Sequence, residues 1–536
     1  MARMPPITPE KVEIQNIGSG GIVRDRPGHL LPPGAWTDGN NIRFNNNTCE
    51  RTGGHEPVFA GSSVVPYQLF NVPGLLGESF WIYLSLTSAW AVESGIHTDI
   101  TRTVGGAYTT VNGRDWCPTL LAGVPILTNN IDVPQWWPSL DVGTKLANLP
   151  NWDANKRCKR IIAWGSYVFA LNLTETGTRR PHKILVSHKA DPGSVPNSWD
   201  PSDATKDATE FELTDAEGGE ILDALPLVDQ LIVYKEFSAH SIRFQGGGEL
   251  WKRDRLFENV GILAPRCVCS FKEGTMHFVA TQNDLIVHSG SPGSSQSIVE
   301  GIIREQLFDS IDATNYANSF CFAHPKRPEL WFAFPETGNT YPNRACVYNY
   351  VSKTTAFVDF SGLSIDFGLA GLTPSVTWDA STDTWDTVAE AWQSSARQVL
   401  VFCDPVASKF YELDAGLDFD GYVFPAFLER VGLAYEGKTV RFGQRILIDR
   451  VWIKANGLGK WKVRVGMQET REAEITWSTE VIFDPAGMGG VTGVGMYVDV
   501  DPPANGRIPA IRFESYEALP SELEGYDLRV SPLGEF

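Results

Sequence analysis

The stretch DQLIVYKEFSAHSIRF, residues 229–244, has the pattern that decides the fold. An apolar run, a short polar turn and a second apolar run follow one another, which is typical of two antiparallel strands joined by a tight connection. The pattern recurs in GTMHFVATQNDLIVHSG from Gly274 and in RQVLVFCDPVASKFYELDAG from Arg397. Apolar runs of this length, bounded by Gly, Pro, Asn or Asp, predict an all-β chain built from hairpins and meanders.

These units recur at irregular steps between positions 60 and 420. A four-stranded propeller blade needs about 40–50 residues, so this span predicts a degenerate β-propeller of about six or seven blades. Stacked β-sandwiches are the alternative arrangement. Helical periodicity is confined to the stretches 300–316 and 387–398, which we expect to be short helices between sheets.

The pattern of apolar and polar residues changes after about residue 424. KWKVRVGM (460–467) places Trp461, Val463 and Val465 on one face of a strand and basic side chains on the other. MYVDVDPP alternates in the same way, which indicates an antiparallel sandwich with one wet face. The predicted organisation is an N-terminal strand and docking segment (1–60), a propeller-like domain (61–423) and a C-terminal β-sandwich with closing strands (424–536).

Composition limits the function classes. The 536 residues include 64 Asp and Glu against 45 Lys and Arg, a formal net charge of −19. Such a chain is a poor general nucleic-acid binder, although it could form a surface that DNA slides past without adhering. The N-terminus lacks the apolar core of a secretion signal, and no uncharged stretch predicts a membrane span. The eight cysteines have no ligand spacing and are expected to be reduced, mostly buried thiols.

Catalytic motifs are missing from the sequence. It contains no nucleophile elbow, no H-E-x-x-H, no P-loop and no G-x-G-x-x-G before a helix, and its nine histidines are dispersed. We therefore predict no enzyme, and no catalytic, cofactor-binding or metal-binding residue. Two alternatives stay open: a propeller that binds or hydrolyses carbohydrate through paired carboxylates, and an extracellular adhesive β-protein, which would usually carry a secretion signal.

The segment GGIVRDRPGHLLPPGAWTDGNNIRFNNNTCERTGGHEPVF (20–59) is the most specific stretch. It resembles the opening of the tail nozzle proteins of podoviruses, the short-tailed bacteriophages, also described as tail tubular protein B-like or DNA-stabilisation proteins. The resemblance lies in a D-G-N-N-x-R-F turn and an R-x-G hook, formed here by Asp38, Gly39, Asn40, Asn41, Arg43, Phe44, Arg51 and Gly53. A Lys-Glu-x-Ser unit at Lys235 and the closing segment GRIPAIRFESYEALPSELEGYDLRVSPLGEF also resemble the family.

The resemblance implies a structural virion protein, a β-propeller subunit of the tail nozzle. Subunits of this family form a homo-oligomeric ring, expected to be a hexamer, beneath the portal and adaptor. The ring extends the channel for DNA ejection, retains the packaged genome and carries fibres or spikes. The implied location is the virion tail, after assembly in the host cytoplasm, and the implied activity needs no cofactor.

Two groups of residues are candidates for roles in such a ring. We hypothesise that a dense acidic segment lines or rims the channel, where it would keep double-stranded DNA from adhering during its transient passage; the alternative is a solvated loop on the outer wall. Its members are Asp200, Asp203, Asp207, Glu210, Glu212, Asp215 and Glu217. Large aromatic residues in Pro-rich loops are candidates for the contact between subunits, with core packing inside a blade as the alternative. They are Trp136, Trp137, Trp152 and Trp199.

Overall fold

The computed structural model describes residues 9–74, 79–93, 95–215, 218–360, 362–372, 397–433, 444–485 and 497–534. Within these residues the chain is almost entirely β, with a single α-helix, α1 (Arg304–Ser310), and three 3-10 turns, η1 (Gly28–Leu30), η2 (Gly113–Asp115) and η3 (Tyr316–Asn318). The expected helix within 300–316 is confirmed by α1. The second expected helix, 387–398, lies outside the described residues up to position 396.

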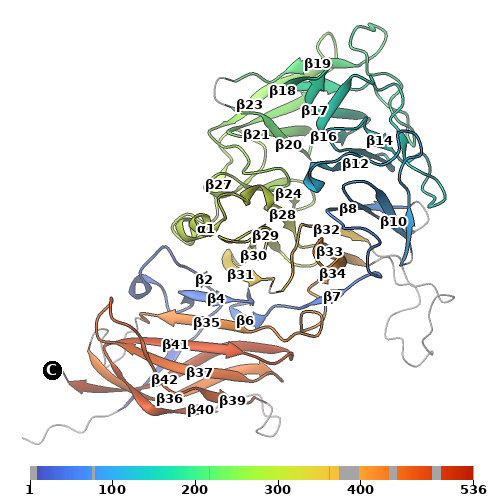
Figure 1. The fold of residues 1–536 in the computed structure, drawn as a ribbon. Helices are drawn as coiled ribbons and strands as arrows, with labels where there is room; N and C mark the ends of the chain where they lie inside the picture. The colour runs from blue at the N-terminus through green and yellow to red at the C-terminus, as the bar shows by residue number, and fades with distance from the viewer. Residues whose placement is uncertain are drawn as a thin grey trace, which may run out of the picture.

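Seven four-stranded antiparallel sheets follow one another in the described residues, and they confirm the propeller (Figure 1). The first blade contains β8 (Gln68–Pro73), β9 (Ser79–Leu84), β10 (Ala89–Glu93) and β11 (Ile96–Asp99), and the second contains β12 (Cys117–Leu121), β13 (Val124–Thr128), β14 (Gln135–Trp136) and β15 (Ala147–Asn148). The third blade contains β16 (Lys156–Trp164), β17 (Tyr167–Glu175), β18 (Thr178–Val186) and β19 (Thr209–Glu212). The fourth blade contains β20 (Ile221–Leu227), β21 (Gln230–Lys235), β22 (Ser238–Phe244) and β23 (Trp251–Glu258). The fifth blade contains β24 (Val268–Phe271), β25 (Met276–Ala280), β26 (Leu285–His288) and β27 (Gln296–Ser297). The sixth blade contains β28 (Phe320–Ala323), β29 (Glu329–Phe334), β30 (Arg344–Asn349) and β31 (Thr354–Asp359). The seventh blade contains β32 (Phe367–Leu372), β33 (Gln398–Asp404), β34 (Lys409–Leu413) and β7 (His55–Pro57).

The seventh sheet closes the ring of blades with a strand from the other end of the chain. Its first three strands come from the C-terminal side of the propeller, and its outer strand is β7, from the N-terminal segment. β7 pairs antiparallel with β34, with His55 opposite Leu413 and Pro57 opposite Tyr411. In Figure 1 the blue β7 lies beside the orange β34. Because β7 leads along the chain into β8, closure by this strand ties the last blade to the first.

Two larger sheets form the C-terminal β-sandwich. In the described residues the first contains β40 (Tyr497–Gly506), β36 (Arg445–Gly457), β42 (Ser521–Gly534), β6 (Thr48–Arg51), β5 (Ile42–Asn45) and β1 (Glu10–Ile14), and the second contains β38 (Thr476–Trp477), β37 (Trp461–Gln468), β41 (Ile508–Ser515), β35 (Ala426–Val431), β4 (Asp38–Asn40) and β39 (Val481–Phe483). Trp36, of the short strand β3 (Ala35–Trp36) that pairs with β2 (Gly21–Ile22), packs between the sheets. Its ring lies 6.1 Å from that of Phe513 and 6.3 Å from that of Tyr526.

The alternation in KWKVRVGM gives the expected half-buried strand. Trp461, Val463 and Val465 of β37 are buried in the sandwich core. On the opposite face, Lys462 and Arg464 both contact Glu480. The basic side chains of β37 therefore form the wet face that the sequence predicted.

The N-terminal segment shares its strands between the two domains. β1, β4, β5 and β6 pair within the sandwich sheets, whereas β7 pairs within the propeller. Residues 9–57 thus cross the boundary between the domains, and one hydrophobic cluster runs through both of them, from Trp331 in the propeller to Trp461 in the sandwich. The candidate functional site lies along this crossing.

Candidate functional site at the propeller–sandwich junction

The D-G-N-N turn is where the sandwich meets the sixth blade. Asn41 has a left-handed backbone (φ 57°), a conformation that asparagine tolerates better than most residues. Its side chain donates to the carbonyl of Pro425 (2.9 Å) and accepts from the backbone N–H of Asp359 (2.9 Å). Gly39 must be small, because a Cβ there would approach both Leu428 and the Phe427 carbonyl to 3.0 Å. The turn is therefore a joint between β31 and β35.

Arg43, two residues further on, carries the central ion pair of this joint. Its guanidinium donates to both carboxylate oxygens of Glu329 (2.5 and 3.2 Å) and to Asp414 Oδ1 (3.1 Å). Burial alone would lower the pKa of Arg43, but Glu329 and Asp414 more than offset it and raise the pKa. Asp414 is also bound by Arg327 Nε (2.9 Å). Although burial opposes it, these neighbours hold the pKa of Asp414 well below its usual range.

Arg51 and Gly53, which form the R-x-G hook, hold the same joint together through hydrogen bonds that involve backbone groups. Arg51 donates to the carbonyls of Glu517 (2.5 Å) and Phe424 (2.6 Å), and its guanidinium lies 4.2 Å from the centre of the Phe424 ring. Burial lowers the pKa of Arg51 to about 10. Gly53 donates its backbone N–H to Asp414 Oδ1 (3.0 Å), and a Cβ at Gly53 would lie 2.2 Å from that oxygen. We call the contacts of Asn41, Arg43, Arg51 and Gly53 the seam.

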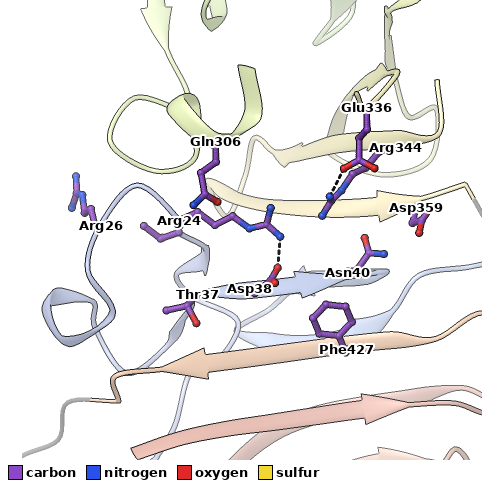
Figure 2. Close-up of a pocket in the computed structure, with 11 residues that line it drawn as sticks. Arg24, Arg26, Thr37, Asp38, Asn40, Gln306, Glu336, Arg344, Asp359 and Phe427 are labelled. Carbon is purple, nitrogen blue, oxygen red and sulfur yellow. Dashed lines mark hydrogen bonds and ion pairs between the residues drawn. The ribbon is translucent and has the colours of Figure 1, made fainter. Parts of the chain in front are cut away.

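A polar pocket of about 600 Å³ opens beside the seam (Figure 2). We call it the junction pocket. Its charged and amide side chains come from the segment after β2, from β4, α1, β30 and β31, and from the turn after β29. These side chains are Arg24, Arg26, Asp38, Asn40, Gln306, Glu336, Arg344 and Asp359. Figure 2 shows them converging from the propeller and from the N-terminal segment, with Phe427 of β35 beside them.

Most charges in the junction pocket are already paired. Arg24 is hydrogen-bonded to Asp38, and Arg344 donates to Glu336 at 2.6 Å. Arg24 and Arg344 also contact the ring of Phe357, at 4.5 and 4.6 Å from its centre. The lining carries equal numbers of arginines and carboxylates, so their formal charges balance. Sequence patterns gave no signal for Glu336 or Arg344, whereas Arg24 and Asp38 lie inside the stretch 20–59.

The acidic segment lies on the outer side of the third blade. Asp200 is exposed and Asp203 is partly exposed in the loop between β18 and β19, where each accepts a hydrogen bond from the backbone N–H two residues further on. Asp207 is half-buried, and Glu217 lies outside the described residues. Glu210 and Glu212 belong to β19, the strand of this sheet farthest from β16, and Glu210 contacts Lys183 at 2.9 Å. In this subunit the segment follows the rim of the propeller disc.

Asp215 corrects one member of that prediction, because its side chain is buried. It accepts hydrogen bonds from Lys235 and, at 2.5 Å, from the Ser238 hydroxyl. Although burial opposes it, these donors hold the pKa of Asp215 well below its usual range. The Lys-Glu-x-Ser unit therefore anchors the end of the acidic segment, and Asp215 offers no charge to a channel.

Three of the four tryptophans pack inside the propeller. Trp137 is buried, with its ring 5.5 Å from Phe80, and Trp152 and Trp199 are buried against each other at 4.7 Å. These rings have no surface left for a neighbouring subunit, so the core-packing alternative describes them. Trp136 is partly exposed on β14, and its interface role stays a prediction.

The remaining sequence expectations concern thiols, metals and membranes. All eight cysteines are free, and all are buried except Cys269, which is partly exposed. The described residues contain no group of three or more His, Cys, Asp or Glu side chains placed to hold a metal ion. In the same part of the chain, no helix has the length and apolar character needed to cross a bilayer.

Comparison with known proteins gives distant likenesses only. No protein-family profile matches the chain, and no curated protein matches it. One similar solved structure is PorZ, a surface component of the type-IX secretion system of Porphyromonas gingivalis, which is 11% identical to this chain with a TM-score of 0.35. The match covers 81% of this chain and 46% of PorZ, so it spans about half of PorZ. YCF48 from Cyanidioschyzon merolae (12%, TM-score 0.36) matches over 67% of this chain and 98% of its own. A putative 6-phosphogluconolactonase from Bacteroides fragilis (11%, TM-score 0.36) matches over 66% and 87%. Likenesses this distant carry no argument about function.

Proposed function

We propose that this chain is a structural protein of the virion, the subunit of a ring-shaped tail nozzle of a short-tailed bacteriophage. In that role it extends the channel for DNA ejection, retains the packaged genome, and meets an adaptor on one side and fibres or spikes on the other. The ring is a homo-oligomer, which we take to be a hexamer. The role is mechanical and involves no catalysis.

The observation that carries this proposal is the position of the residues that resemble the nozzle family. Asn41, Arg43, Arg51 and Gly53 are all engaged in the seam, where they bind the propeller to the sandwich. They are structural residues, with side chains turned inward rather than towards a substrate. A subunit that must transmit load around a pressurised channel needs its two domains to move as one body, and a buried, charge-paired seam supplies that rigidity.

The charge of the chain suits the passage of DNA. Neutralising phosphates with Lys and Arg is what makes a protein adhere to DNA, and this chain has 19 more acidic than basic residues. In a narrow passage the gap to the duplex is comparable with the Debye length of about 8 Å, so repulsion persists at physiological salt. An acidic ring therefore allows DNA to move through it without drag.

The carbohydrate-binding or glycan-hydrolysing propeller is not favoured by any particular feature. Hydrolysis needs two carboxylates that face a sugar across a cleft. In the junction pocket, Asp38 and Glu336 are each held by an arginine. Neither is positioned as a free acid or nucleophile.

Assembly of the purified chain tests the proposal. We expect light scattering over a wide concentration range to detect a species near six times the 59.1 kDa chain mass, and negative-stain images to show rings with a central opening. A monomer at every concentration, which also fails to join tail-less particles of its phage, would contradict the nozzle role. Hydrolysis or tight binding of surface glycans by that monomer would support the alternative.

A further inference from the structure

The centre of the propeller contains a cavity of about 390 Å³, which we call the propeller channel. Its lining comes from the first strand of every blade, β8, β12, β16, β20, β24, β28 and β32, with a few residues that flank them. Aromatic rings form much of the wall, among them Trp116, Phe322 and Phe367. A concave, mainly apolar cavity with a few converging polar groups is the usual form of a small-molecule site.

Two arginines enter this apolar cavity with donors to spare. Arg160 on β16 has only 2% of its surface exposed, and its Nε donates to the Leu222 carbonyl at 3.1 Å. Arg266, just before β24, uses one Nη for the carbonyl of Arg114 at 3.1 Å. Each guanidinium carries five N–H donors. Arg160 also contacts the Cys117 thiol, and within the described residues the other donors of the two side chains have no hydrogen-bond partner. These spare donors are open to the channel rather than sealed in the core, so a ligand that accepts from them can take the place of water.

The carboxylates around the channel do not satisfy these donors. Asp223, which also lines it, accepts from the backbone N–H groups of Ala224 and Arg266 at 2.9 Å each. Asp366 lies behind the lining and is ion-paired with Arg114. Asp115 is also outside the lining, near enough to both lining arginines to attract them.

The lining therefore carries two positive groups and one negative group. Arg266 lies over a ring of the channel wall, with its guanidinium carbon 4.8 Å from the centre of the Phe367 ring. Burial, with repulsion by Arg160 and Arg114, lowers the pKa of Arg266 to about 10 even though Asp366 opposes that change. Positive charge in the channel is thus only partly compensated.

We propose that the propeller channel is a binding site for a small organic anion with a flat apolar body and an oxyanion headgroup. The headgroup, a carboxylate or a phosphate monoester, accepts hydrogen bonds from Arg160 and Arg266. The apolar body lies against Trp116, Phe322 and Phe367. Guanidinium groups suit both headgroups, since their paired N–H donors match two oxygens of either one. The inference does not depend on the nozzle role.

Calorimetry on the wild-type chain provides the first test, because it needs no variant. We expect 1-naphthoate to bind at least about tenfold more tightly than its neutral amide, 1-naphthamide, since only the acid carries a charge for the arginines. 1-Naphthyl phosphate, measured beside them, shows which headgroup is preferred. Equal binding of the acid and the amide, or no binding of the acid and the phosphate, would overturn the proposal.

Substitutions then locate the site. R160Q and R266Q, each checked for native circular dichroism, should weaken binding of the preferred anion by about tenfold or more. R253Q is the matched control, because Arg253 lies outside the channel on β23 and pairs with Glu249. If both R160Q and R266Q fold and bind the anion as the wild type does, the site is elsewhere and the inference fails. If they do not fold, a wild-type structure soaked with the anion decides, and an empty channel refutes the inference.

Discussion

Arg43 on β5 and Glu329 on β29 are 286 positions apart in the chain, yet they form a buried bidentate ion pair. Trp331 adds a third donor to the same carboxylate at 3.1 Å. Because β5 belongs to the sandwich and β29 to the sixth blade, the pair joins the two domains across the seam. A pair of this kind is a good place to test whether the domains are coupled.

Removing Arg43 should destabilise the whole chain. In R43M, Glu329 and Asp414 remain buried without their main partner, and breaking a buried pair in this way typically costs about 3–5 kcal/mol. Denaturant unfolding measures the loss. R445Q is the control, because Arg445 makes an exposed ion pair with Glu469, and it should change the unfolding free energy by less than about 0.5 kcal/mol. An R43M chain as stable as R445Q would show that the seam does not couple the domains.

Gly53 should tolerate no side chain. In G53A the new Cβ would overlap Asp414 Oδ1, so the hydrogen bond from the backbone of residue 53 must break or the loop must move. Overpacking of this kind costs about 1–3 kcal/mol. G248A is matched to it, because a Cβ at Gly248 meets no atom within 4 Å and its φ is not positive. Thermal melts should rank G53A well below G248A; the opposite order would contradict the tight approach.

His55 on the closing strand should make stability depend on pH. It is stacked 4.3 Å from Phe419 with both ring nitrogens buried, and burial lowers its pKa to about 3. The unfolded chain takes up a proton below about pH 6.5, whereas the folded chain does not until about pH 3. Stability from His55 is therefore complete above pH 6.5 and is lost as the pH falls, by about 3 kcal/mol at pH 4.

H55F keeps the aromatic stack and removes the titrating group. Its unfolding free energy should fall less than that of the wild type between pH 7 and pH 4, in urea titrations at each pH. H29N removes a partly exposed histidine and serves as the control for the loss of one imidazole. Parallel profiles for H55F and the wild type would rule out His55 as a source of acid sensitivity.

Tyr234 links two buried histidines between the fourth and fifth blades. His288 Nδ1 accepts from the Gly290 N–H (3.1 Å), so its Nε2 carries the proton and donates to the Tyr234 oxygen (2.7 Å). His277 Nε2 donates to the Pro226 carbonyl (3.0 Å), so its Nδ1 accepts from the Tyr234 hydroxyl (2.7 Å). Each ring nitrogen has one partner of the correct kind, and the Tyr234 hydroxyl both donates and accepts, which fixes both tautomers.

Y234F should therefore cost about 1–3 kcal/mol, because it leaves one buried donor and one buried acceptor unpaired. Chemical denaturation near neutral pH is the appropriate measurement, since both histidines are neutral there. Y316F removes a hydroxyl from a tyrosine with 40% of its surface exposed and should have little effect. A loss in Y234F no greater than in Y316F would show that water replaces the missing hydroxyl.

The sequence was sufficient for the local strands and insufficient for their long-range pairing. The alternation in 229–244 predicted the hairpin that became β21 and β22, and Trp461, Val463 and Val465 predicted the buried face of β37. β7 has only three residues, HEP, without an apolar run, and its partner lies more than 350 positions away. The sequence also could not show whether a tryptophan packs in the core or at an interface between subunits, because Trp137 and Trp152 suit either environment. Only the packing of the blades decides it.

Charge reversal on the acidic segment tests where that segment would lie in the proposed nozzle ring. Asp200 is exposed and Asp203 is partly exposed in the same surface loop, so the double change to lysine should leave the fold intact. If the rim of the third blade faces the passage, lysines there would bind DNA phosphates, and particles that carry D200K/D203K should release DNA more slowly, an effect that weakens as salt rises. E524K is the control, because Glu524 is exposed on β42 in the sandwich and distant from this rim. Release at the wild-type rate in D200K/D203K would place the segment on the outer wall of the ring, where its charge serves solubility and does not act on DNA.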